Sequence, residues 1–150
     1  MKNREMPGAR LLIMALAMVA AGALVSCGSD GGGENGIMRN GVTFYSAASP
    51  GPWTEQAADH DPEISITRTG DRKTINVTVP FTQRKEKDHF LEAIIILDLN
   101  GRELKKVSFE RGRDHRGARF DFPEEYTAPV YVVIKCNKHD MWEKLVDWSE

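Results

Sequence analysis

The chain has 150 residues, of which 41% are hydrophobic and 28% are charged, and its formal net charge is −2 at pH 7. Residues 1–26 contain three basic residues and one acidic residue, so the remainder carries a formal charge of −4. The basic residues of this acidic remainder are scattered along the sequence, which excludes the basic surface of a nucleic-acid-binding protein.

Residues 1–26 are typical of a secretory signal. Lys2, Arg4 and Arg10 precede an apolar run from Leu11 to Val25. This run is shorter than the roughly twenty residues that a membrane-spanning helix needs. The sequence therefore predicts export from the cytoplasm.

The signal ends in Leu24-Val25-Ser26-Cys27, which resembles the bacterial lipobox. In that type of signal the cysteine becomes the first mature residue and carries acyl chains, and several chains together anchor a protein stably. We expect a lipoprotein attached to a membrane through Cys27, on the periplasmic or cell-surface side. Gly28, in place of an aspartate after the cysteine, favours the outer membrane. The alternative is an ordinary signal that is cleaved nearby and leaves Cys27 unmodified.

Three segments follow from composition and pattern. Residues 1–26 form the signal, residues 27–40 form the lipidated cysteine and a glycine-rich tether, and residues 41–150 form one folded domain. Alternating or continuous apolar runs predict strands in the domain at Val42–Tyr45, Glu63–Thr69, Thr74–Phe81, Leu91–Leu99, Glu103–Phe109, Ala118–Phe122, Ala128–Lys135 and Trp142–Trp148. About seven short strands favour an all-β, immunoglobulin-like sandwich, with a small barrel as the alternative. A stretch around Thr54 to Ala58 has an ambiguous, helix-like pattern.

Cys136 is the most informative residue of the domain. The chain has two cysteines, and the expected lipidation of Cys27 leaves Cys136 with no disulfide partner in an exported protein. His139 follows three residues later, after a strand-like run, and a thiolate and an imidazole at this spacing can bind one metal ion. His60 and His89 also lie at predicted strand boundaries, whereas His115 lies in a polar loop. Taken singly, such a histidine is more often a surface residue, and such a cysteine a small core residue.

Three motifs carry a family resemblance. Cys136-Asn137-x-His139-x-x-Trp142 resembles the Cys-Asn-x-His-Gly-x-Trp signature of superoxide reductases, the neelaredoxin and desulfoferrodoxin family. Asp88-His89-Phe90-Leu91 resembles that family's Glu-His-Tyr-Ile, and His60-Asp61-Pro62 resembles its His-Val-Pro. The resemblance implies an immunoglobulin-like sandwich with a mononuclear ferrous iron held by four imidazoles and an axial thiolate. It assigns His60, His89 and His139 to three of the imidazoles and Cys136 to the thiolate.

The chain departs from the family pattern at three positions. The fourth histidine corresponds to Gln83, which is a poorer ligand for iron(II). The family's lysine before the first histidine corresponds to Asp59, and its glycine after the last histidine corresponds to Asp140. In the family that lysine attracts superoxide. We hypothesise that Lys85, Lys87 or Lys138 supplies a replacement positive charge.

The resemblance implies an oxidoreductase that reduces superoxide to hydrogen peroxide with electrons from an external donor. No cysteine set for a second iron centre precedes the domain. One alternative is a non-catalytic protein that binds zinc, copper or iron. Another is a metal-free, immunoglobulin-like surface lipoprotein that binds other molecules.

Overall fold

The computed structural model describes residues 36–80, 88–111, 115–138 and 141–149. The expected signal, Cys27 and most of the tether lie outside these residues. The chain divides into two compact units, residues 1–30 and residues 31–150, and the β-sheets lie in the second. Within the described residues, no helix is long and apolar enough to cross a membrane.

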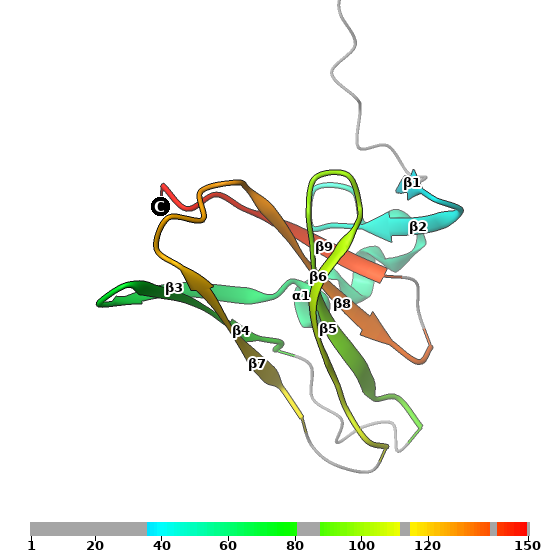
Figure 1. Cartoon of the computed structure of the whole chain (residues 1–150). Helices are drawn as coiled ribbons and strands as arrows, with labels where there is room; N and C mark the ends of the chain where they lie inside the picture. Colours follow the sequence, from blue (N-terminus) through cyan, green and yellow to red (C-terminus); the bar gives the residue numbers. More distant parts are fainter. Residues whose placement is uncertain (1–35, 81–87, 112–114, 139–140, 150) are drawn as a thin grey trace, which may run out of the picture. The chain divides into compact units, whose positions relative to one another are not determined.

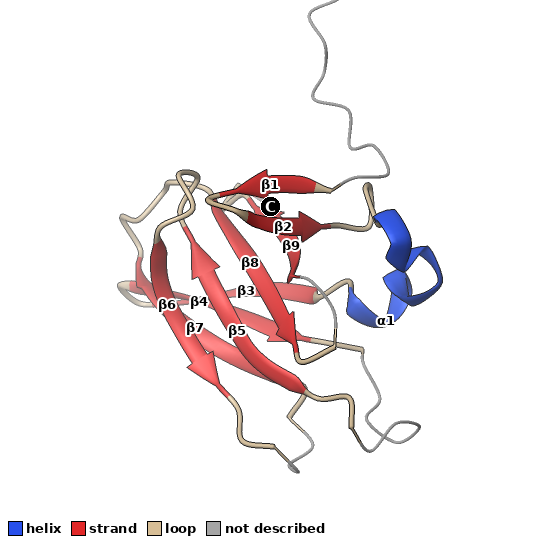
Figure 2. Ribbon diagram, turned by 90° about the vertical axis from the view of Figure 1, so that its right-hand side faces the viewer, coloured by secondary structure: helices blue, strands red, loops and turns tan. Residues whose placement is uncertain are grey.

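The domain consists of two β-sheets (Figures 1 and 2). The larger sheet has the strand order β1-β2-β9-β8-β5-β6. Its strands are β1 (Ile37–Arg39), β2 (Val42–Tyr45), β9 (Met141–Val146), β8 (Val130–Cys136), β5 (Leu91–Leu97) and β6 (Glu103–Ser108). The smaller sheet has the order β3-β4-β7, with β3 (Glu63–Thr69), β4 (Arg72–Thr78) and β7 (Gly117–Pro123). A short 3₁₀ helix, η1 (Gly51–Gln56), and one helical turn, α1 (Ala57–His60), connect β2 to β3.

The main core is formed by the side chains that face inward from both sheets. In β4, Ile75 and Val77 are 0% and 3% exposed, and they pair with Ile66 and Ile64 of β3. In the larger sheet, Ile94 and Ile96 of β5 belong to the same core cluster as these residues. Each such side chain removed from water stabilises the fold by about 1.5–3 kcal/mol before the entropy cost of ordering it.

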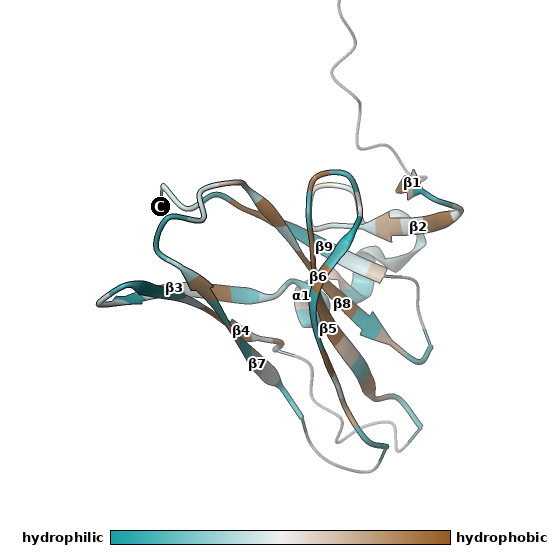
Figure 3. Ribbon diagram, viewed as in Figure 1, coloured by the Kyte–Doolittle hydropathy of each residue, from teal (hydrophilic) through white to brown (hydrophobic). Residues whose placement is uncertain are grey.

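The second face of β5 is also covered. Its alternate residues Ala93, Ile95 and Leu97 form a smaller cluster with Phe44 of β2 and Val133 of β8. Because successive side chains of a strand point to opposite faces, β5 is apolar on both sides. This explains the continuous hydrophobic run from Ala93 to Leu97, and β5 is largely brown in Figure 3.

The fold class predicted from the sequence is confirmed: the domain is mostly β and has the immunoglobulin-like two-sheet arrangement. β2 and β3 have the predicted bounds, and the other predicted strands differ from the observed ones by three residues or fewer at the described ends. The prediction missed β1, which lies within residues 27–40, the segment assigned to the tether. The strand predicted to begin at Thr74 begins two residues earlier, at Arg72. The ambiguous stretch near Thr54 is helical, in η1 and α1.

Candidate metal centre

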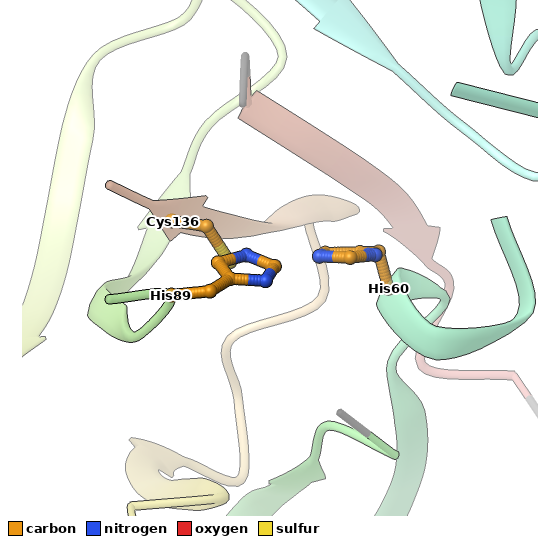
Figure 4. Close-up of side chains that lie close together, drawn as sticks. All are labelled: His60, His89 and Cys136. Carbon is orange, nitrogen blue, oxygen red and sulfur yellow. The ribbon is translucent and has the colours of Figure 1, made fainter. Parts of the chain in front are cut away.

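Two histidines and one cysteine meet at one end of the sandwich. The potential ligand atoms of His60, His89 and Cys136 all lie within 4.8 Å of one another. Figure 4 shows the His60 ring approaching from α1, while His89 and Cys136 lie side by side opposite it. The three residues are only 1%, 6% and 4% exposed. A buried cluster of nitrogen and sulfur donors from three separate segments is the arrangement expected of a metal site.

His60 is oriented by its own helical turn. Its Nδ1 lies 2.8 Å from the carbonyl oxygen of Gln56. A carbonyl oxygen only accepts hydrogen bonds, so Nδ1 carries the hydrogen and the lone pair of the neutral ring is on Nε2. The ring also stacks on Trp142, with 5.7 Å between ring centroids, and on His89, with 5.4 Å. A metal-binding histidine commonly has its other ring nitrogen bonded to a carbonyl in this way, which fixes the tautomer and orientation.

His89 and Cys136 are brought together by the pairing of β5 with β8. Cys136 is the last residue of β8 and pairs with Leu91, the first residue of β5. His89 precedes that pair by two residues. Strand pairing between residues far apart in the sequence therefore places the imidazole next to the thiol.

The thiol of Cys136 keeps its proton in the metal-free protein. Burial, and secondarily the negative charge of Glu92, raise the pKa of Cys136 to about 12. Burial has this effect because it disfavours the charged thiolate. A metal ion that binds here must displace the proton, and until then the thiol is a poor nucleophile.

The three residues fit a transition metal. Bonds of about 2.0–2.3 Å from one ion to nitrogen and sulfur donors put the donors roughly 3–4.5 Å apart. The separations here, all within 4.8 Å, meet that requirement with little rearrangement. Imidazole and thiolate donors suit zinc, copper and iron, and they do not suit magnesium or calcium.

The sequence that contains these three residues identifies the family of the chain. The sequence profile of desulfoferrodoxins matches residues 53–145, which include all three clustered residues. The chain belongs to the desulfoferrodoxin family. No match was found among curated protein sequences.

Solved structures of superoxide reductases share the desulfoferrodoxin fold of this chain. A superoxide reductase (neelaredoxin) variant from Ignicoccus hospitalis has a TM-score of 0.59 and 23% identity, and the alignment covers 74% of this chain and 97% of that one. A superoxide reductase in the oxidised state has a TM-score of 0.50 and 21% identity, with 69% and 94% covered. The superoxide reductase from Nanoarchaeum equitans has a TM-score of 0.50 and 17% identity, with 60% and 93% covered. At these identities the likeness concerns the fold.

Some predicted site residues of this desulfoferrodoxin domain lie where the structure makes no statement. His139 and Gln83, and also Lys85, Lys87 and Asp140, are outside the described residues. Among the residues that are described, His60, His89 and Cys136 come together, and His115 instead stacks on Phe109 with 4.8 Å between centroids. Lys138 and Asp59 are exposed. Trp142 belongs to the core and also contacts His60.

The structure adds supporting residues that the motif comparison did not single out. The Gln56 carbonyl orients His60. Lys144 donates to the Asp61 carboxylate and to the Pro62 carbonyl, each at 3.0 Å, and so ties the residues after His60 to β9. Arg111 forms an ion pair with Asp88, next to His89, at 3.2 Å. The contacts of Lys144 and Arg111 join segments that are more than twenty residues apart, so local spacing gave no sign of them. The Gln56 contact is local but uses a backbone carbonyl, which no side-chain pattern marks.

Proposed function

We propose that this protein is an exported, superoxide-reductase-like oxidoreductase with a mononuclear iron(II) site. His60, His89 and Cys136 would hold the ion, together with His139 from the same motif as Cys136. The observation that carries the proposal is the buried cluster of two imidazoles and one thiol within a desulfoferrodoxin domain. The reaction converts superoxide, one electron and two protons into hydrogen peroxide, with the electron from an external donor.

The bound iron would supply the one-electron chemistry, and the protein supplies its surroundings. His60 is held by Gln56 and Trp142, and the low exposure of all three clustered residues keeps bulk water away from the sulfur. A thiolate ligand raises the electron density on iron, as it does in thiolate-ligated haem proteins.

Attraction of the superoxide anion requires positive charge near the site. Asp59 stands where the family has a lysine, so another residue must supply it. Arg111, whose side chain is 70% exposed beside the His89 segment, now joins Lys85, Lys87 and Lys138 as a candidate, although its charge is partly offset by Asp88. Alanine variants of the four, assayed at low and high salt, would identify the contributor. Unchanged superoxide turnover in all four would rule out this steering role.

Metal content tests the proposal directly. The protein, purified without oxygen and without added metal, is expected to contain close to one iron per chain. A Cys136→Ser variant is expected to lose that iron, because a hydroxyl is a much poorer ligand than a thiolate. If the protein contains iron, superoxide consumption should then be assayed with an artificial reductant. Absence of any metal from the wild-type protein would overturn the proposal.

A metal-binding role without turnover is the second candidate. The donor set in the described residues, two imidazoles and a thiolate, satisfies zinc or copper as well as iron. Stoichiometric zinc or copper in protein isolated from its native cells, with no superoxide consumption, would favour this role over the reductase.

We also propose that the protein is a lipoprotein anchored through Cys27. The proposal is supported by the Leu24-Val25-Ser26-Cys27 sequence that follows the apolar run. Mass spectrometry of the N-terminal peptide is expected to find acyl chains on Cys27, and fractionation is expected to find the protein in the membrane, in the outer one where two exist. A Cys27→Ser variant should lack the modification. A soluble mature protein with unmodified Cys27 would refute the anchor.

A further inference from the structure

We propose that Asn137 is a positioning residue that fixes His89 against Cys136 before any metal binds. The inference rests on the proposed metal site and assigns a specific task to a residue that is not itself a ligand. It concerns the way in which two of the ligands are held at the correct separation.

Asn137 contacts the backbone on both sides of His89. Its side-chain Oδ1 accepts a hydrogen bond from the Phe90 amide at 2.8 Å, and its Nδ2 donates to the Asp88 carbonyl at 2.6 Å. Its own amide donates to the Phe90 carbonyl at 3.2 Å. The residues before and after His89 are therefore both bonded to the residue that follows Cys136.

These contacts lie where regular strand pairing ends. The β5–β8 ladder stops at the pair of Leu91 with Cys136, and its register is irregular between Leu91 and Ala93. Residues 88–90 lie beyond β5, so the ladder does not fix them. Asn137 extends the ladder with its main chain and uses its side chain as a further strand-like partner. His89 and Cys136 thereby become parts of one unit, whereas His60 is supported separately by α1 and Gln56.

The task suits asparagine in particular. A single amide group offers a donor and an acceptor about 2 Å apart, as a peptide group does, so it can bond the N–H and the C=O of another segment together. Aspartate at this position keeps the acceptor for the Phe90 amide and loses the donor for the Asp88 carbonyl. Alanine loses both.

The contacts are expected to affect metal binding more than global stability. Asn137 is exposed, so water competes for its hydrogen bonds and each contributes only about 1 kcal/mol to folding. Loss of the hydrogen bonds from the Asn137 side chain to Asp88 and Phe90 releases the His89 segment locally. Metal binding then has to order that segment. Removal of groups that orient metal ligands typically weakens metal affinity by about 10–100-fold.

Cobalt(II) binding to the full chain in mild detergent tests the inference. Cobalt reports both affinity, by competition with a chelator, and geometry, by the absorption band of the cobalt–thiolate bond. We expect Asn137→Ala to bind cobalt about 10–100-fold more weakly with a weaker thiolate band, while thermal unfolding of the metal-free protein changes little. The matched control is Asn76→Ala, since Asn76 also bonds to a backbone carbonyl, that of Ser65, in the other sheet. It should leave cobalt affinity unchanged.

Amide hydrogen exchange of the metal-free protein gives a second readout that does not depend on a bound metal. The Phe90 amide should exchange about tenfold faster or more in Asn137→Ala, and Asn137→Asp, which keeps the acceptor, should restore part of its protection. Wild-type cobalt affinity and unchanged Phe90 exchange in Asn137→Ala would overturn the inference. If that variant does not fold, unchanged affinity and thiolate band in Asn137→Asp would overturn it instead. Wild-type protein that binds neither cobalt nor iron would count against the proposed function. The exchange rate of the Phe90 amide would still decide whether Asn137 fixes the backbone on both sides of His89.

Discussion

Cys136 sets the pH dependence of the candidate site, since its pKa of about 12 keeps the thiol protonated in the metal-free protein. A metal ion binds in exchange for that proton. We therefore expect the affinity for cobalt or zinc to rise about tenfold per pH unit between roughly pH 7.5 and 9, because one thiol proton is displaced for each ion bound. Competition titrations at constant ionic strength measure this slope. A pH-independent affinity in that range would contradict thiolate ligation.

The same residue affects the stability of the metal-free protein at high pH. Its folded pKa lies above its ordinary value of 9.0, so the unfolded chain loses the proton first as the pH rises. The contribution of the buried thiol is fully present below about pH 9 and declines between 9 and 12, by about 1.4 kcal/mol per pH unit. Urea unfolding at pH 8 and 10.5 should show a steeper loss of stability in the wild type than in Cys136→Ala. Parallel losses in the two proteins would show that the thiol ionises normally.

The histidines allow a matched comparison of a site residue with a loop residue. We expect His89→Ala to weaken cobalt binding by at least about 100-fold, since it removes one of the few donors of the site. His115→Ala should bind cobalt like the wild type, because His115 stacks on Phe109 and is not part of the cluster. Isothermal titration of both variants with cobalt measures the difference. Equal losses in the two would mean that the clustered residues do not form the site.

At the level of single residues, the sequence pointed to three residues that the structure brings together, and it missed the groups that orient them. His60, His89 and Cys136 stand in motifs or at strand ends, and such positions can be recognised along the chain. Gln56 acts through its backbone carbonyl, which any residue possesses, so no side-chain pattern marks it. The contacts of Asn137 with Asp88 and Phe90 span 49 and 47 positions. Only the folded chain brings these groups together.

Among the secondary-structure elements, apolar patterning located each strand from β2 to β9, with errors of up to three residues at the described ends. β3 alternates between polar and apolar residues and was predicted with its correct bounds. β1 was missed because its residues follow a glycine-rich polar stretch, although Asn40-Gly41 between Arg39 and Val42 is a strong hairpin sequence. Both turn residues have positive φ, 50° and 79°, as such a turn requires. The helical residues before His60 span only η1 and α1, which is too short for a helical period to appear.

The β1–β2 hairpin joins the larger sheet through the pairing of β2 with β9, and an arginine adds a side-chain contact. Arg39 forms an ion pair with Glu143 of β9, whose side chain is 4% exposed, and its guanidinium lies 4.2 Å from the centre of the Tyr131 ring. Arg39→Ala would leave Glu143 buried without that partner, so we expect it to lower the free energy of unfolding by about 3 kcal/mol.

Urea denaturation measures this loss, and Arg102→Ala is its control. Arg102 also pairs with a carboxylate, that of Asp98, but its side chain is 77% exposed. An exposed ion pair contributes about 0–1 kcal/mol, so the control should lose little stability. Similar losses in the two variants would show that the Arg39–Glu143 ion pair, despite the burial of Glu143, contributes no more to stability than an exposed ion pair.

For the whole molecule, the core and the metal centre make separable contributions. The large core cluster extends through both sheets, and Cys136 belongs to it as a buried residue. A domain of this length buries enough apolar surface to fold without a disulfide or a metal. Metal binding should therefore add stability to a fold that already exists, in contrast to small zinc domains that unfold when the metal is removed.

Removal and re-addition of metal test this separation. The chelator-treated protein is expected to unfold cooperatively, and a free metal concentration 100 times the Kd is expected to raise the free energy of unfolding by about 2.7 kcal/mol. For a domain of this size that corresponds to roughly 10 °C in Tm. Differential scanning calorimetry with and without cobalt measures the shift, and Cys136→Ser, which lacks the thiolate, should show little or none. If chelation instead abolishes the cooperative transition, the sandwich depends on its metal, and the core formed by β4, β5 and β8 is not sufficient to hold the two sheets together.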